Sequence, residues 1–134
     1  MKKATTNLTI LLQNLKPTLN PGEYVFCTIS SVGKINMEEI IMIFKESESF
    51  TVVLLREAAD KIGLGYDVVY SWITLTVHSS LEAIGLTAAF SNALSDQNIS
   101  CNVVAGFYHD HIFVNIKDTA ASIHALEKLS CESL

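Results

Sequence analysis

The sequence predicts an α+β fold in which helices cover one face of an antiparallel β-sheet. The patterns that predict it are clearest in the second half of the chain. Residues 72–78 alternate apolar and polar side chains, which is the period of a strand with one buried face. Residues 86–94 repeat apolar side chains at helical spacing and predict an amphipathic helix. Residues 99–107 and 112–116 predict two further strands, joined by a tight connection at 108–111.

A final helix completes the predicted order of strand, helix, strand, strand and helix. Asp118 is placed to cap it, and Ala120, Ile123, Leu126 and Leu129 line one of its faces. Crossover helices on one side of a sheet with a central hairpin form the split βαβ arrangement, called ferredoxin-like, whose full order is βαββαβ.

The first half of the chain has a similar pattern. Leucines at helical spacing predict a helix over residues 8–15, and Pro17 stops it. Strands are expected at 23–29 and 50–56, and a short helix over 57–62 follows the second of them. The run from 37 to 47 fits either a strand or a buried helical turn.

This order matches the second half with its first strand missing. At 134 residues, the chain suits one compact domain or two very small ones that share a core. We therefore predict two units, residues 1–68 and residues 69–134, that pack as a pseudo-repeat and complete each other's sheets.

Composition restricts the partners and the compartment. The formal net charge is −5, and Lys2-Lys3 is the only basic run, so nucleic acid and anionic membrane surfaces are not expected partners. No apolar stretch reaches the roughly 20 residues that span a bilayer, and no signal peptide is recognisable. Cys27, Cys101 and Cys131 form an odd set without a CxxC motif, which favours reduced thiols and a cytoplasmic protein.

The stretch His109-Asp110-His111 permits three interpretations. Two histidines in an HxH pattern on a strand point to one face and suit a metal, but His78 and His124 have no ligand spacing to them. The pair also suits a hairpin that contacts a ligand or an interface, or a plain turn in which Asp110 serves the bend. We predict no metal.

Catalytic motifs and cofactor motifs are missing from the sequence. The candidate nucleophiles with a possible base are Ser79-Ser80 beside His78 and Cys101 with a distant histidine. No GxSxG elbow is present. Gly63 and Gly65 lack the third glycine and the lysine of phosphate-binding loops. We therefore predict a protein that is not an enzyme and that uses no cofactor.

The stretch LTVHSSLEAIGLTAAFSNALSDQNISCNVVAGFYHDHIFV resembles an ACT domain, a small ferredoxin-like module that binds amino acids and related effectors. LLQNLKPTLNPGEYVFCTIS and FTVVLLREAADKIGL are similar to the partner half of a bacterial family of small stand-alone tandem ACT proteins. Together these stretches cover nearly the whole chain, and NPGEYVF with GFYHDHIFV is the most specific pair.

The resemblance implies an effector site formed by residues 79–87 and 98–102. Gly85 lets the backbone approach a ligand, and the N–H groups at a helix start favour a carboxylate. In a simpler interpretation, Gly85 only begins the helix and Asn98 ends it. The predicted ligand-binding residues are Gly85, Leu86, Thr87, Ile99, Ser100, Asn102, His109 and His111.

The function implied by the resemblance is non-catalytic regulation through a small effector, with an amino acid as the first candidate. Family members often place such sites between ACT units, so a homodimer or higher oligomer is expected. The alternative is a protein–protein interaction or oligomerisation module whose site is empty.

Overall fold

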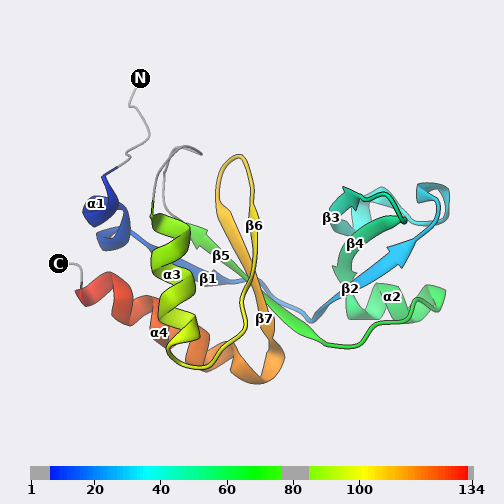
Figure 1. Cartoon of the computed structure of the whole chain (residues 1–134). Helices are drawn as coiled ribbons and strands as arrows, with labels where there is room; N and C mark the ends of the chain where they lie inside the picture. Colours follow the sequence, from blue (N-terminus) through cyan, green and yellow to red (C-terminus); the bar gives the residue numbers. More distant parts are fainter. Residues whose placement is uncertain (1–6, 77–84, 133–134) are drawn as a thin grey trace. The chain divides into compact units, whose positions relative to one another are not determined.

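The computed structural model describes residues 7–76 and 85–132, which form two compact units (Figure 1). The terminal unit contains the chain up to Asn20 and from Ser71 onward. The middle unit is Pro21–Tyr70.

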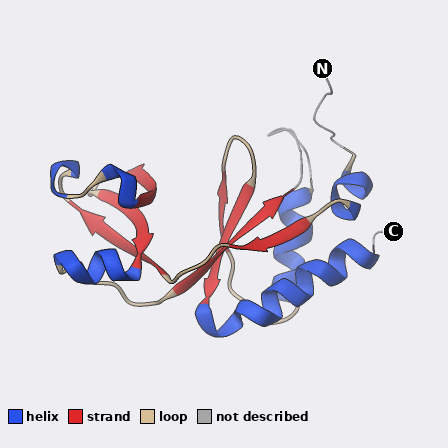
Figure 2. Ribbon diagram, turned by 180° about the vertical axis from the view of Figure 1, so that it is seen from behind, coloured by secondary structure: helices blue, strands red, loops and turns tan. Residues whose placement is uncertain are grey.

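The terminal unit is a complete ferredoxin-like unit with one additional helix. Its sheet has the order β1–β5–β7–β6, in which β1 is antiparallel to β5 and β6 is antiparallel to β7. Its helices lie together on one side of the strands (Figures 1 and 2). The elements are α1 (Leu8–Gln13), β1 (Lys16–Leu19), β5 (Tyr70–Thr76), α3 (Leu86–Ser95), β6 (Asn102–Ala105), β7 (Asp110–Asn115), the 3-10 helix η3 (Ile116–Asp118) and α4 (Thr119–Glu132).

The core of this unit forms where the sequence pattern predicts it. Ile73 and Leu75 of β5 are fully buried, whereas Trp72 and Thr74, which alternate with them, are half-buried on the other face. Phe90 of α3 is fully buried against the same cluster. The predicted α+β, ferredoxin-like class is therefore confirmed.

Residues 7–20 belong to the terminal unit rather than to the middle unit. Leu11 and Leu15 enter its core with 0% and 3% exposure, and Lys16 of β1 pairs with Thr76 of β5. β1 was not predicted from the sequence, because Pro17 removes one hydrogen-bond donor and weakens the strand pattern. An edge strand tolerates that loss. In space, the compact units thus divide the chain differently from the predicted ranges 1–68 and 69–134.

The middle unit is a three-stranded antiparallel sheet with one helix. The strand order is β2–β4–β3, and Cys27 of β2 pairs with Val52 of β4. The ambiguous run 37–47 is a 3-10 turn followed by a strand. The elements are β2 (Tyr24–Ile29), the 3-10 helices η1 (Val32–Lys34) and η2 (Met37–Glu39), β3 (Ile40–Lys45), β4 (Phe50–Leu55) and α2 (Arg56–Ile62).

The cysteines are free thiols in different environments. Burial raises the pKa of the Cys101 thiol to about 11. Burial, and secondarily the negative charge of Asp60, also raises the pKa of Cys27. Both thiols are therefore protonated at neutral pH, while Cys131 is exposed. Over residues 7–76 and 85–132, the helices are all too short or too polar to cross a membrane.

Candidate functional site

Gly85 begins α3 in a conformation that favours glycine. Its φ of +90° is left-handed, and an added Cβ would lie 3.2 Å from Leu8 Cδ2. Ala89 N donates to Gly85 O at 2.9 Å, and no side chain of the described residues caps the helix. Leu86 is buried in the core and Thr87 is exposed. Among the described residues, the backbone N–H groups at this helix start therefore have no side-chain cap, and such groups can bind a carboxylate. Predicted loop residues 79–84 lie outside the described residues.

Ile99, Ser100 and Asn102 lie at the opposite end of α3. The helix has 10 residues and is thus about 15 Å long. Asn98, with φ +61°, follows it in the left-handed conformation that the simpler interpretation expects, and Ile99 N donates to Leu94 O at 3.0 Å. Within one terminal unit, the structure does not bring these residues to Gly85.

Their side chains also have different environments. Ile99 is 5% exposed and belongs to the core, so only its backbone is available to a ligand. Ser100 is exposed between α3 and β6. Asn102 begins β6, where its Nδ2 donates to Phe113 O at 3.2 Å.

The hairpin that contains the two histidines turns earlier than predicted. Gly106 N donates to His109 O at 2.9 Å, and Asp110 already pairs with Ala105 in the β6–β7 ladder. An added Cβ on Gly106 would lie 2.9 Å from the same carbonyl oxygen, so the turn needs glycine. Asp110 therefore lies in the ladder as the first residue of β7, and the bend itself is formed by the residues before it.

His111 is a neutral imidazole with a defined tautomer. Its Nδ1 accepts a hydrogen bond from Trp72 Nε1 at 3.0 Å, and an indole N–H can only donate. Thr74 Oγ1 lies 3.1 Å from the same nitrogen and accepts from Asn20 Nδ2 at 2.8 Å. The proton of neutral His111 is therefore on Nε2.

This tautomer opposes metal binding by the histidine pair. A metal on His111 Nε2 would require the proton on Nδ1, where Trp72 already donates. His109 Nδ1 is buried without a hydrogen-bond partner among the described atoms. The part of the chain that the structure describes contains no group of three His, Cys, Asp or Glu residues placed to hold a metal ion.

The environment of His111 predicts acid sensitivity. Burial, and secondarily the charge of His109, holds the pKa of His111 below its ordinary 6.5, while Asp110 opposes this shift. The unfolded state then binds more protons, so the free energy of unfolding should fall as pH drops below 6.5, by at most about 1.4 kcal/mol per pH unit. Urea unfolding at pH 7 and 5.5 should show this loss, and His111→Gln should reduce it.

Asp110, next to His111, has the opposite effect on the pH dependence of stability. Burial raises the pKa of its carboxyl above 3.8, with the charge of His111 opposing, so the folded state binds the extra proton. The contribution of Asp110 to stability is therefore fully present below pH 3.8 and is lost as the pH rises through its raised pKa. This pH dependence is opposite in sign to that expected from His111. An equal loss of stability between pH 7 and 5.5 in His111→Gln would assign the effect to other groups.

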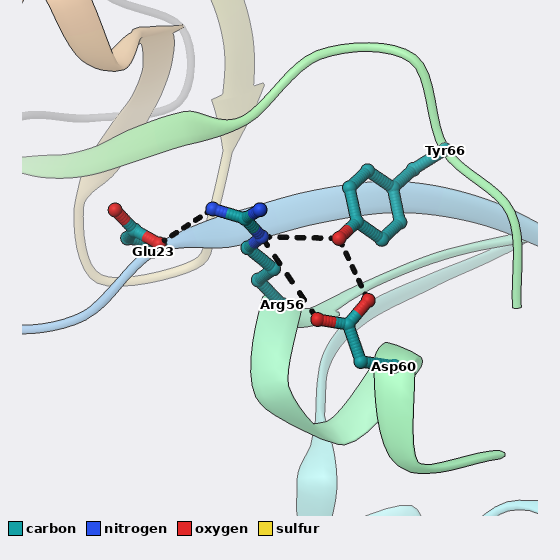
Figure 3. A network of polar contacts seen from close by, with 4 residues as sticks. All are labelled: Glu23, Arg56, Asp60 and Tyr66. Atoms are coloured by element: carbon teal, nitrogen blue, oxygen red, sulfur yellow. Dashed lines mark hydrogen bonds and ion pairs between the residues drawn. The ribbon is translucent and has the colours of Figure 1, made fainter. Parts of the chain in front are cut away.

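A second polar cluster lies in the middle unit (Figure 3). Arg56 Nη1 donates to Glu23 Oε1 at 3.2 Å, and its Nε donates to Tyr66 OH at 3.0 Å. Tyr66 OH donates to Asp60 Oδ1 at 2.7 Å, and Asp60 Oδ2 lies 3.9 Å from Arg56 Nε. This cluster was not predicted from the sequence. Only the i,i+4 pair of Arg56 and Asp60 was visible without tertiary contacts.

Comparison with known proteins decides the family. Two sequence profiles described as ACT domain match residues 3–71 and 67–128. A Vibrio cholerae structure, described as a protein of unknown function and a possible transport protein, is 44% identical, with a TM-score of 0.84. That match covers 93% of this chain and 97% of the other. The chain belongs to the ACT-domain family.

Less similar structures share the ACT-type fold. An Agrobacterium tumefaciens protein is 18% identical, with a TM-score of 0.72, over 87% of this chain and 90% of its own. The regulatory subunit of aspartate kinase from Thermus thermophilus, in a ligand-free form, is 8% identical with a TM-score of 0.57, over 84% of this chain and 95% of its own. No curated protein matches the chain by sequence.

Membership in the ACT family supports a regulatory role that depends on a small ligand, in general terms. The two ACT profiles follow one another along the chain and meet near residues 67–71. In space, the segment up to Asn20, which lies within the first profile, contributes α1 and β1 to the terminal unit. The terminal unit therefore contains segments from both profile matches.

Proposed function

We propose that this protein is a non-catalytic cytoplasmic regulator whose ACT repeats bind a small effector, with an amino acid as the first candidate. The observation that carries the proposal is the start of α3, where Gly85 has a φ of +90° and no described side chain caps the helix. Uncapped N–H groups and the positive end of the helix dipole attract a carboxylate. The raised pKa of Cys101, caused by burial, makes that thiol a poor nucleophile and supports a non-catalytic role.

The separation of the predicted residues supports an oligomeric site. Gly85 and Ser100 lie at opposite ends of α3, about 15 Å apart along its axis. A single amino acid is too short to reach both within one copy. We propose that Gly85–Thr87 of one copy and Ser100–Asn102 of another meet across a homo-oligomer interface, where the effector stabilises one packing.

Thermal unfolding of the full chain against each free amino acid tests this proposal. Saturation at 100 times the dissociation constant stabilises the folded state by about 2.7 kcal/mol, which raises the unfolding temperature by several degrees. A rise with one amino acid, unchanged by a chelator, is the expected result. If every amino acid leaves the unfolding temperature unchanged, an amino-acid sensor is contradicted.

One observation favours the alternative of an interaction module with an empty site. Phe107 and Tyr108, at the tip of the β6–β7 hairpin, are 79% and 77% exposed and contact each other edge to face. Exposed aromatic pairs are typical of protein interfaces. A tight oligomer that Phe107→Ser dissociates, together with no amino-acid response, would support this second function.

A further inference from the structure

We infer that the middle unit carries a second small-molecule site, built around Arg56, for a basic amino acid. A pocket of about 420 Å³ lies where the chain enters β2 and α2, which is within the size range of small-molecule sites. This inference rests on residues remote in sequence from Gly85, so it stands apart from the proposed α3 site. The pocket is lined by Gly22, Glu23, Leu55, Arg56, Glu57 and Asp60.

The guanidinium of Arg56 is held in place with donors to spare. Glu23 and Tyr66 together take one N–H from Nη1 and the N–H of Nε. A guanidinium has five N–H donors. In Figure 3, the second terminal nitrogen carries no contact and points away from Asp60. A planar group already fixed by neighbours loses little freedom when it binds a carboxylate.

The charges around the pocket select a ligand that also carries ammonium groups. Glu23, Glu57 and Asp60 oppose the single positive charge of Arg56, so a simple anion is repelled. Glu57 is exposed, and its carboxylate makes no hydrogen bond or ion pair within residues 7–76 and 85–132. A basic amino acid satisfies both features, because its carboxylate suits Arg56 and its ammonium groups suit the carboxylates.

The backbone beside the pocket is also specialised. Gly22 has a φ of +105°, and an added Cβ would lie 2.7 Å from Leu55 Cδ2. A side chain at this position would displace the leucine that lines the pocket. Glycine at this position therefore leaves room for the Leu55 side chain that lines the pocket.

Calorimetric titration of the full chain with L-lysine and L-arginine tests the site. At least one of these should bind, and Arg56→Lys should weaken it tenfold or more, because lysine lacks the planar fork. Glu57→Gln should weaken it about two- to fivefold, the range of one exposed ion pair. Glu48→Gln removes an equal charge from another exposed position of the same unit and should leave the affinity unchanged.

Two further probes separate this site from a general attraction of cations. 1,5-Diaminopentane carries the two amines without the carboxylate and should bind at least tenfold more weakly than lysine, and L-glutamate should not bind. Gly85→Val should leave lysine binding intact, which distinguishes this site from the start of α3. Absence of binding by lysine and arginine, or unchanged binding in both Glu57→Gln and a folded Arg56→Lys, would overturn the inference.

Discussion

A fragment of residues 69–134 is expected to be unfolded in isolation, although it contains all but two residues of the match to the second ACT profile, 67–128. It lacks β1, which pairs along β5 from Leu19 to Lys16, and it lacks Leu11 and Leu15 of the core. Loss of one buried leucine side chain costs about 2–5 kcal/mol, against a total stability of about 5–15 kcal/mol for a domain. Circular dichroism and amide proton dispersion in NMR spectra measure the result.

A peptide of residues 7–20 added to this fragment is the matched control. It restores α1 and β1, so the mixture should regain helical signal and a cooperative thermal transition. A peptide with Leu11→Ala and Leu15→Ala should fail at the same concentration, because both side chains are nearly fully buried. Cooperative unfolding of the fragment alone would contradict the dependence of the terminal unit on the first 20 residues.

The elements that the sequence predicts well are those with a strong local period. In α3, Leu86, Phe90 and Leu94 recur at helical spacing and all three are buried. β1 has only four residues and contains Pro17, so its assignment depends on pairing with a strand more than 50 residues away. Local pattern cannot supply such a partner, so the contribution of residues 7–20 to the terminal unit is not visible from the sequence.

The candidate sites show the same division between local and distant information. The position of Gly85 at the start of α3 is predictable, because this glycine directly precedes an amphipathic helical pattern. The bond from Trp72 to His111 joins residues 39 positions apart, and it fixes a tautomer that the HxH pattern alone leaves open. The cluster of Arg56 similarly depends on Glu23 from another strand.

Gly85→Val is expected to abolish the effector-induced rise in unfolding temperature and to lower stability by about 1–3 kcal/mol. A φ of +90° is strained for a β-branched residue, and the new Cβ would lie 3.2 Å from Leu8 Cδ2. The helix start can relieve this strain only by moving the backbone N–H groups that we propose to hold the carboxylate. Thermal unfolding with and without the effector measures both effects.

Gly63→Val separates strain from binding. Gly63 ends α2 with a φ of +75°, and its added Cβ would meet no atom within 4 Å. This variant should lose a similar amount of stability, because the backbone strain is similar, yet keep the full response to the effector. If both variants respond to the effector as the wild-type protein does, the carboxylate does not bind at the start of α3. If both lose the response, the loss reflects general destabilisation rather than a contact at Gly85.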